Sequence, residues 1–257
     1  MAVSENSACC NRLKKTGQGT VADKSATQRH KSLLPRGNRL NRAKDRNAKD
    51  APMDTPEQPQ IYLITPPTIA LSSFPDQLAR VLDGAEIACI RLALAGNDED
   101  TISRAADVCR EVAHARDVAL VIANHVLLSQ RLGLDGVHLD DAARSVRAAR
   151  KELGPDAIVG SFCGASSHDG MTAGEAGADY VAFGPVGNAA LGDGSRAEQD
   201  LFQWWSEMIE VPVVAEGALT PDLIGTLAPF TDFFGIGEEI WSQDDPLSTL
   251  KTMMDAM

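Results

Sequence analysis

Short runs of apolar residues alternate with longer amphipathic segments from residue 61 to the end of the chain. The runs are rich in Val, Ile, Leu and Ala and are bounded by polar residues or glycine, which is typical of strands buried on both faces of a parallel sheet. Eight such runs predict strands over residues 61–65, 86–92, 118–123, 136–139, 158–161, 180–183, 211–215 and 233–236.

The segments between these strands have helical periodicity. In residues 99–115 the apolar positions recur at i, i+3, i+4 and i+7, so one face of a helix can pack against a sheet. Strands that alternate with helices predict an α/β fold, and eight such units in about 200 residues match one closed (β/α)8 TIM barrel over residues 58–257. Further helices are predicted over residues 142–152, 172–177, 197–209 and 221–227.

An open doubly wound sheet is the alternative architecture. A dinucleotide-binding sheet of that kind needs a Gly-x-Gly-x-x-Gly turn after its first strand, and this turn is missing after residue 65. In a barrel, the chemistry lies at the carboxyl ends of the strands. The residues at those ends, which we take as candidate site residues, are Arg91, Asn124, His138, Asp140, Asp141, Ser161, Cys163, Gly184, Glu216, Gly217, Gly237 and Glu238.

Charge divides the chain into two parts. Residues 1–50 hold 12 Lys and Arg against 4 Asp and Glu, whereas the remaining 207 residues hold 12 against 32. Because the first segment has few apolar residues, we expect residues 1–57 to be a disordered basic tail, either a binding arm or an extension upstream of a start at Met53. The acidic body would repel phosphate backbones and anionic lipids, so neither nucleic acid nor a membrane is an expected partner.

Cysteine usage favours the cytoplasm. The five cysteines form no Cys-x-x-Cys pair, as expected for free thiols in a reducing compartment, and the N-terminus lacks the apolar core of a secretory signal. The longest apolar stretch, near residues 118–128, is interrupted by Asn124 and His125 and is shorter than the roughly 20 residues of a membrane span. Trp204 and Trp205 predict packing in the outer ring of helices or a homo-oligomer contact.

Four motifs, in order along the chain, carry a family resemblance. They are Tyr62-Leu63-Ile64-Thr65 in the first strand, Asp135-Gly136-Val137-His138-Leu139 in the fourth, Gly177-Ala178-Asp179-Tyr180-Val181 with Gly184-Pro185 in the sixth, and Val211-Pro212-Val213-Val214-Ala215 in the seventh. In this set and order the chain resembles the thiamine phosphate synthase and TenI-like family. The resemblance implies a barrel in thiamine metabolism that joins a hydroxymethylpyrimidine diphosphate to a thiazole phosphate and releases pyrophosphate.

The resemblance also implies magnesium, which neutralises the departing pyrophosphate, and here the chain departs from the family. The family's Asn-Asp pair after strand three reads Asn124-His125, and Ala143 stands where a second carboxylate is expected. Asp140 and Asp141 are then the candidate magnesium ligands. The Gln-Leu-Arg-x-Lys segment of strand two keeps its arginine as Arg91 but has Ala93 in place of the lysine.

The phosphate-binding positions implied by the resemblance change as well. The loop after Gly184 lacks the family's threonines and lysine, although glycines such as Gly192 can still offer backbone amides. Glu216-Gly217 replaces a Gly-Gly turn, and Glu238 follows Gly237 where the family has serine. We expect two added carboxylates to repel a phosphate by an energy on the order of a few kcal/mol.

Two further candidates come from residue chemistry. Cys163 can act as a nucleophile with His138 or His168 as its base, or it can be a packing residue at the end of an apolar strand. His138 can contact a ligand, or it can be hydrogen-bonded inside the barrel. Arg91 can bind an anion or pair with Glu216.

Three functions follow from these readings. They are the family reaction, an enzyme on a less phosphorylated heterocycle that uses Cys163, His138 and His168, and a non-catalytic ligand-binding or regulatory barrel.

Overall fold

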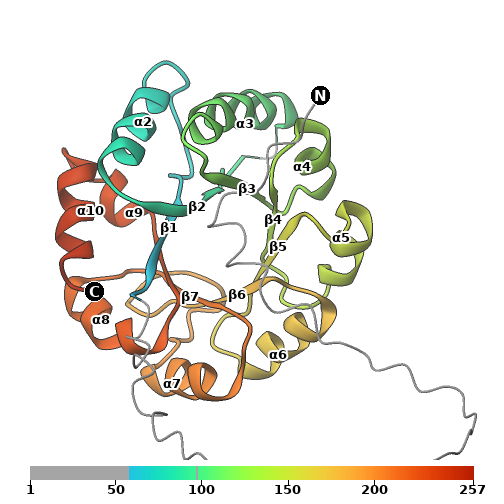
Figure 1. The fold of residues 1–257 in the computed structure, drawn as a ribbon, viewed down its shortest axis with the longest axis vertical. Coiled ribbons are helices and arrows are strands. Elements are labelled where there is room, and N and C mark those ends of the chain that lie inside the picture. The colour runs from blue at the N-terminus through green and yellow to red at the C-terminus, as the bar shows by residue number, and fades with distance from the viewer. Residues whose placement is uncertain (1–57, 97) are drawn as a thin grey trace, which may run out of the picture. The chain divides into compact units, whose positions relative to one another are not determined.

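The computed structural model describes residues 58–96 and 98–257; the predictions for residues 1–57, including the basic tail, lie outside them. Eight parallel strands close into a barrel in chain order, β1 to β8, and each pairs with its sequence neighbours (Figure 1). This confirms the predicted fold. The strands are β1 Gln60–Ile64, β2 Ile87–Leu92, β3 Ala119–Ala123, β4 Gly136–Leu139, β5 Ile158–Phe162, β6 Tyr180–Phe183, β7 Val213–Glu216 and β8 Phe233–Ile236.

Helices surround the barrel on its outside (Figure 1). Several begin at residues whose side chains accept a hydrogen bond from the backbone one turn later: Asp98, Ser166 and Thr220 cap α3, α6 and α8. The helices are α2 Phe74–Gly84, α3 Glu99–His114, α4 Val126–Leu132, α5 Val146–Leu153, α6 Ser167–Ala176, α7 Gln199–Met208, α8 Pro221–Leu227, α9 Glu238–Trp241 and α10 Pro246–Met254, with a 3₁₀ turn over Ala228–Phe230.

Helix α6 begins at Ser167, whereas residues 172–177 were the predicted helix. The segment before residue 172 is rich in Ser, Cys, His and Gly and lacks helical periodicity, which favours a loop, yet Gly170 lies inside the observed helix. A Cβ atom at Gly170 would lie 2.7 Å from the ring of Phe183 and 2.8 Å from that of Trp205. The glycine is therefore required by close packing against α7, which sequence periodicity does not report.

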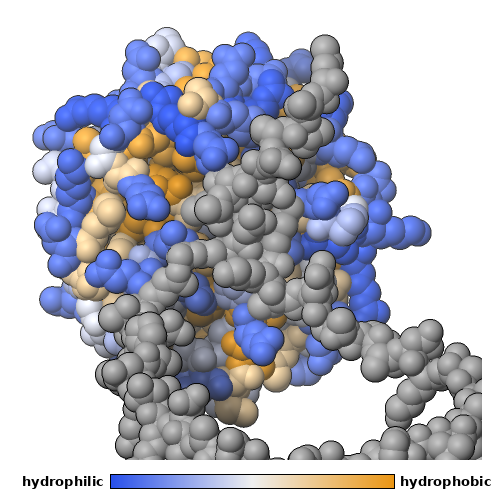
Figure 2. Space-filling model, in the orientation of Figure 1, coloured by the Kyte–Doolittle hydropathy of each residue, from blue (hydrophilic) through white to orange (hydrophobic). Residues whose placement is uncertain are grey.

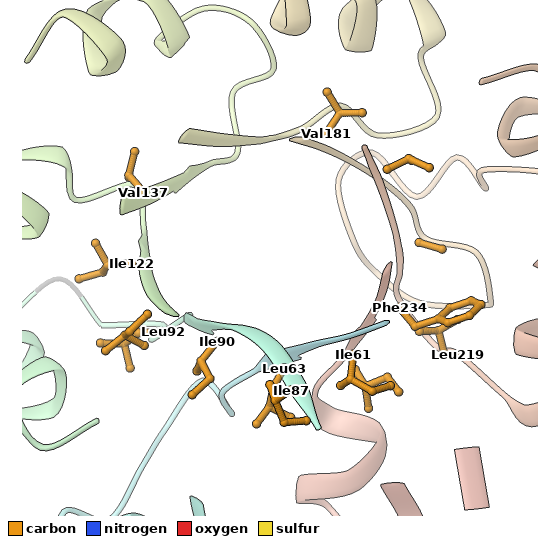
Figure 3. Close-up of a cluster of buried hydrophobic side chains, with 14 of the residues drawn as sticks. Ile61, Leu63, Ile87, Ile90, Leu92, Ile122, Val137, Val181, Leu219 and Phe234 are labelled. Carbon is orange, nitrogen blue, oxygen red and sulfur yellow. The ribbon is translucent and has the colours of Figure 1, made fainter. Parts of the chain in front are cut away.

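Two apolar layers alternate along the strands. Side chains such as Ile61, Leu63, Ile122 and Val137 point away from the barrel axis toward the helices (Figure 3). The side chains at the alternate strand positions fill the barrel interior, and they include Tyr62, Val121, Tyr180 and Val214. This division follows from the two-residue repeat of a strand.

Aspartates tie neighbouring strands together at the amino end of the barrel. Asp135, Asp179 and Asp232, which precede β4, β6 and β8, accept hydrogen bonds from the backbone N–H groups of Leu120, Val159 and Val213 at 2.7, 2.7 and 2.8 Å. Each carboxylate satisfies a donor at the start of the preceding odd-numbered strand. These aspartates stabilise the face opposite the one that carries chemistry in such barrels.

The face seen in Figure 2 has a mostly polar rim with hydrophobic residues between the polar ones. Among the described residues, the exposed large hydrophobic side chains are Leu127, Trp204 and Met208, whereas Trp205 is buried. Trp205 therefore packs in the outer ring, as one of the two readings predicted, and contacts the ring of Phe183 with centroids 4.9 Å apart. Among the described helices, none has the length and apolar content needed to cross a membrane.

Gly160 makes room for the interior tyrosine. A Cβ at this position would lie 2.0 Å from Cζ of Tyr180, which is fully buried. We expect Gly160→Ala to lower the free energy of unfolding by about 3 kcal/mol or more, because neither the ring nor the strand can move aside. Urea denaturation measures this, with Gly96→Ala as the control, since a Cβ there meets nothing within 4 Å. Equal stability of the two variants would contradict the interior packing.

Candidate active site

A buried ion pair crosses the upper barrel interior. Arg91 of β2 is 8% exposed, and its Nη2 donates to Oε2 of Glu216, the last residue of β7, at 2.6 Å. Its Nη1 lies 3.4 Å from the other carboxylate oxygen. Burial is the largest single effect and acts to lower the pKa of the guanidinium, but the Glu216 carboxylate together with Tyr62 and Tyr180 raises the pKa overall. Arg91 therefore stays charged, and of its two predicted roles the pairing with Glu216 is confirmed.

Burial and the contact with Arg91 together keep His138 of β4 neutral. Arg91 Nη1 lies 2.6 Å from His138 Nε2, and because a guanidinium has only donors, Nε2 must accept. Burial, together with the Arg91 charge, holds the pKa of His138 well below its ordinary value, so the ring is neutral with its proton on Nδ1. This is the interior, hydrogen-bonded position that was one of the two predictions for His138.

The hydrogen-bond chain continues across the barrel. His138 Nδ1 donates to the hydroxyl of Tyr180 at 2.9 Å, and that hydroxyl shares a 2.5 Å hydrogen bond with the hydroxyl of Tyr62. Burial raises the pKa of both tyrosines. Arg91 Cζ lies 5.7 Å from the centre of the Tyr62 ring, which closes a loop of contacts among β1, β2, β4, β6 and β7.

Asn124 and Asp140 pair at the rim, at the carboxyl ends of β3 and β4. Asn124 Nδ2 donates to Asp140 Oδ2 at 2.8 Å, and the Asp140 N–H donates to Asn124 Oδ1 at 3.1 Å. Asn124 has φ of 60°, a left-handed conformation that asparagine tolerates better than most residues. Both amide ends of Asn124 are thus engaged by Asp140.

The candidate metal ligands do not converge. Asp141 accepts from the Ser145 hydroxyl at 2.6 Å through Oδ2, while its Oδ1 is buried without a hydrogen-bond partner in the described chain. Asp140 faces Asn124, and over residues 58–96 and 98–257 no three His, Cys, Asp or Glu side chains group to hold a metal ion. Magnesium prefers an octahedral set of oxygens, so two carboxylates turned to separate partners do not fit it.

Cys163, His138 and His168 are not brought together. Cys163 packs in the apolar layer between barrel and helices, and burial raises the pKa of its thiol to about 12. Both ring nitrogens of His138 are bound to Arg91 and Tyr180, and His168 is exposed on α6. Ser161 donates to the carbonyl of Ala142 at 2.8 Å. The Cys163 sulfur contacts the Ser161 hydroxyl and carbonyl, and the nearby Asp169 carboxylate raises the pKa of the thiol further, so these surroundings do not activate Cys163 as a nucleophile.

The candidate glycines make close backbone contacts around the loop after β6. A Cβ at Gly184 would lie 2.3 Å from the carbonyl oxygen of Glu216, and Gly187 N–H donates to the carbonyl of Gly217 at 2.9 Å. Gly217 has φ of 92°, whereas Gly192 is exposed with φ of 60°. Gly184 and Gly217 are therefore explained by packing between the loops that follow β6 and β7.

A carboxylate lies beside Gly237, but it belongs to Glu239. Glu239 accepts from the backbone N–H groups of Gly237 at 2.8 Å and Leu219 at 3.1 Å, while Glu238 is exposed. Sequence reasoning named Glu238 and missed Glu239, Tyr62 and Tyr180. The two-residue parity of the strands could have placed both tyrosines inside, since each shares the inward parity of its strand.

Comparison with known proteins identifies the family and supports the barrel fold. Residues 61–230 match the family of thiamine monophosphate synthase. The chain belongs to this family. This match confirms the resemblance to the thiamine phosphate synthase family that the four strand motifs indicated.

Individual relatives extend the match over most of the barrel. A thiamine-phosphate synthase of Rhodospirillum centenum is 40% identical over 187 residues, which cover 71% of this chain and 89% of that protein. One of Erythrobacter litoralis is 38% identical over 192 residues, 72% of this chain and 90% of the other. A thiamine phosphate pyrophosphorylase structure from Pyrococcus furiosus has a TM-score of 0.66 at 18% identity over 77% of this chain and 96% of that one, which supports the fold.

The neutral His138 makes stability depend on pH. Its pKa in the folded state lies below the ordinary value of about 6.5, so below that pH the unfolded chain takes up a proton that the folded chain excludes. We expect the free energy of unfolding to fall with decreasing pH below about 6.5, with this residue contributing up to about 1.4 kcal/mol per pH unit. His138→Gln should remove that contribution. Urea denaturation measured from pH 7.5 to 5 should then show that the free energy of unfolding changes less steeply with pH in this variant than in the unmodified protein. Parallel slopes would mean that His138 takes up a proton as readily in the folded chain as in the unfolded chain, which contradicts its lowered pKa.

The ion pair predicts an asymmetry between single and double variants. Glu216→Ala leaves the Arg91 charge buried and unpaired, and we expect it to destabilise the protein by about 3–5 kcal/mol. Arg91→Met with Glu216→Leu removes both charges and should lose less stability than Glu216→Ala alone. Urea denaturation compares them, and a double variant that is less stable than Glu216→Ala would contradict the pair as described.

Proposed function

We propose that this protein is a thiamine-phosphate synthase of the cytoplasm, which joins a hydroxymethylpyrimidine diphosphate to a thiazole phosphate. In this reaction the bond from the pyrimidine methylene carbon to its diphosphate oxygen breaks, a bond from that carbon to the thiazole nitrogen forms, and pyrophosphate leaves. The observation that carries the proposal is the family match along residues 61–230. Two relatives named thiamine-phosphate synthase are 38–40% identical to this chain over about nine-tenths of their own length.

The interior network would form the floor of the substrate site. Arg91 is held by Glu216 and His138, so its position is fixed before any ligand arrives. Pre-positioned charge lowers the cost of organising a site around a polar ligand. Asn124 and Asp140 would then contact substrate from the rim. Magnesium is a cofactor of the family, but Asp140 and Asp141 are turned to separate partners and do not fit it, so we assign no step to a metal held by these residues.

Turnover tests the proposal directly. The purified full-length protein, given both substrates and magnesium, should release pyrophosphate and form thiamine phosphate, and its gene should rescue a bacterial strain that lacks thiamine phosphate synthase. Asp140→Asn changes the rim without touching the buried network, and we expect it to reduce kcat/KM by at least tenfold. Absence of product, in an assay where an established synthase is active, would refute the proposal.

One observation favours a second candidate, an enzyme on a less phosphorylated heterocycle. The charge of Arg91 is neutralised by Glu216, so the network offers less net positive charge to a diphosphate than an unpaired arginine would. If coupling fails, calorimetric titration with the pyrimidine and thiazole alcohols separates this candidate from a non-catalytic binding barrel. Binding followed by conversion supports the enzyme, and binding without conversion supports the regulatory barrel.

A further inference from the structure

An acidic and an aromatic side chain come together where β4 and β5 reach the mouth of the barrel. The two strands are parallel neighbours, and Leu139 of β4 pairs with Ser161 of β5. The next residues along the two strands are Asp140 and Phe162, and both have the inward parity of their strands, as His138 does. A carboxylate and an aromatic ring are therefore presented side by side at the carboxyl end of the barrel.

Packing holds the Phe162 ring in place. Phe162 is the last residue of β5, is 8% exposed and belongs to the apolar cluster of the barrel interior. The loop after β6 runs beside it: a Cβ at Gly192 would lie 3.1 Å from Cε1 of the ring, and Leu191 packs against the same cluster. The ends of this loop are joined, because the Ala197 N–H donates to the Pro185 carbonyl at 2.9 Å.

The Asp140 carboxylate is fixed but keeps its charge. Asp140 is exposed, and its Oδ2 accepts from Asn124 Nδ2 at 2.8 Å, while its own N–H donates to Asn124 Oδ1 at 3.1 Å. Because the partner is a neutral amide, these hydrogen bonds orient the carboxylate without compensating its negative charge. The rim of the barrel beside Phe162 therefore carries an oriented anion.

The wider surroundings also favour a cation over an anion at this place. The positive charge of Arg91 in the barrel interior is paired with Glu216 at 2.6 Å. Outside the first 50 residues, the chain holds 12 Lys and Arg against 32 Asp and Glu. A surplus of that size gives the protein a negative potential, which attracts cationic ligands.

The proposed reaction produces a cation. The lone pair of the thiazole nitrogen forms the bond to the pyrimidine methylene carbon, and pyrophosphate leaves with the electrons of the bond that breaks. The neutral thiazole thereby becomes a positively charged thiazolium ring. Groups that are already directed at a developing charge stabilise the transition state, and the face of an aromatic ring attracts a cation.

We propose that Phe162 and Asp140 form a cation-recognising corner that contacts the thiazolium ring. Phe162 supplies the face of its ring, and Asp140 supplies the compensating charge. The corner acts on the heterocycle and not on its phosphate, so it is compatible with a phosphorylated substrate. This inference rests on the proposed function for the origin of the cation, but binding of the charged ring can be measured without turnover.

Thiamine is the probe, because it carries the thiazolium ring without a phosphate. Its matched ligand is the analogue in which carbon replaces the ring nitrogen, since that thiophene ring has the same shape and no charge. In calorimetric titration of the full-length protein, we expect thiamine to bind at least tenfold more tightly than the neutral analogue. Equal affinities for the two ligands, or no measurable binding of thiamine, would overturn the proposal.

Substitutions at Phe162 test the role of the aromatic face. Phe162→Leu keeps an apolar side chain without a ring, and the affinity ratio of thiamine to the neutral analogue should fall to about threefold or less. Phe162→Tyr keeps the ring face and should keep the ratio. Phe183→Leu is the matched control, because it makes the same change on β6 at a fully buried position that faces the helices, and its ratio should stay at least tenfold. An equal fall in Phe162→Leu and Phe183→Leu would contradict the proposal.

A variant at the rim keeps the test decisive if Phe162→Leu does not fold. Asp140→Asn removes the charge at an exposed position and keeps an oxygen that can accept from Asn124. We expect it to lower the affinity for thiamine at least threefold and to leave the affinity for the neutral analogue within about twofold. If Asp140→Asn keeps the full affinity ratio, the proposal is wrong.

Turnover separates this inference from the proposed function. If the protein distinguishes thiamine from the neutral analogue through Phe162 and Asp140 but forms no product, the proposed reaction fails and the cation-recognising corner stands. If the protein forms thiamine phosphate but binds the two ligands equally, the proposed function stands and this inference fails.

Discussion

The buried charge of Arg91 is the constraint on which the barrel interior depends. A guanidinium removed from water requires a compensating charge and partners for its donors, and these come from strands on opposite sides of the barrel, Glu216 of β7 and His138 of β4. Because arginine cannot accept a hydrogen bond, it determines the tautomer of His138, which then donates to Tyr180. One charge thereby organises five of the eight strands.

Small residues in the interior accommodate this network. Gly160 leaves space for the Tyr180 ring, and at Gly235 a Cβ would lie 2.8 Å from Cβ of Glu216. Large polar side chains from some strands thus lie over glycines of their neighbours, so the interior is filled without overpacking. The same logic brings the loop after β6 against the turn after β7, where Gly184 and Gly217 make close contacts.

Positive charge at the mouth is limited by this arrangement. Arg91 is paired with Glu216, and the amides after β7 and β8 are paired with Glu239, so two groups that favour phosphate are compensated within the chain. Membership of the thiamine monophosphate synthase family establishes the barrel scaffold and supports the family's class of reaction.

The sequence by itself determined the eight strands, the alternation with helices and the family, because strand and helix periodicities are local and the motifs are contiguous. It also named Arg91, His138 and Glu216, each at a strand end. Only the tertiary structure decided that these three meet across the barrel, that Cys163 faces the helices, and that Glu239 rather than Glu238 reaches the amides of Leu219 and Gly237. The reason is physical: partners such as Arg91 and Glu216 are 125 residues apart in the chain, and closure of the barrel alone brings them within hydrogen-bond distance.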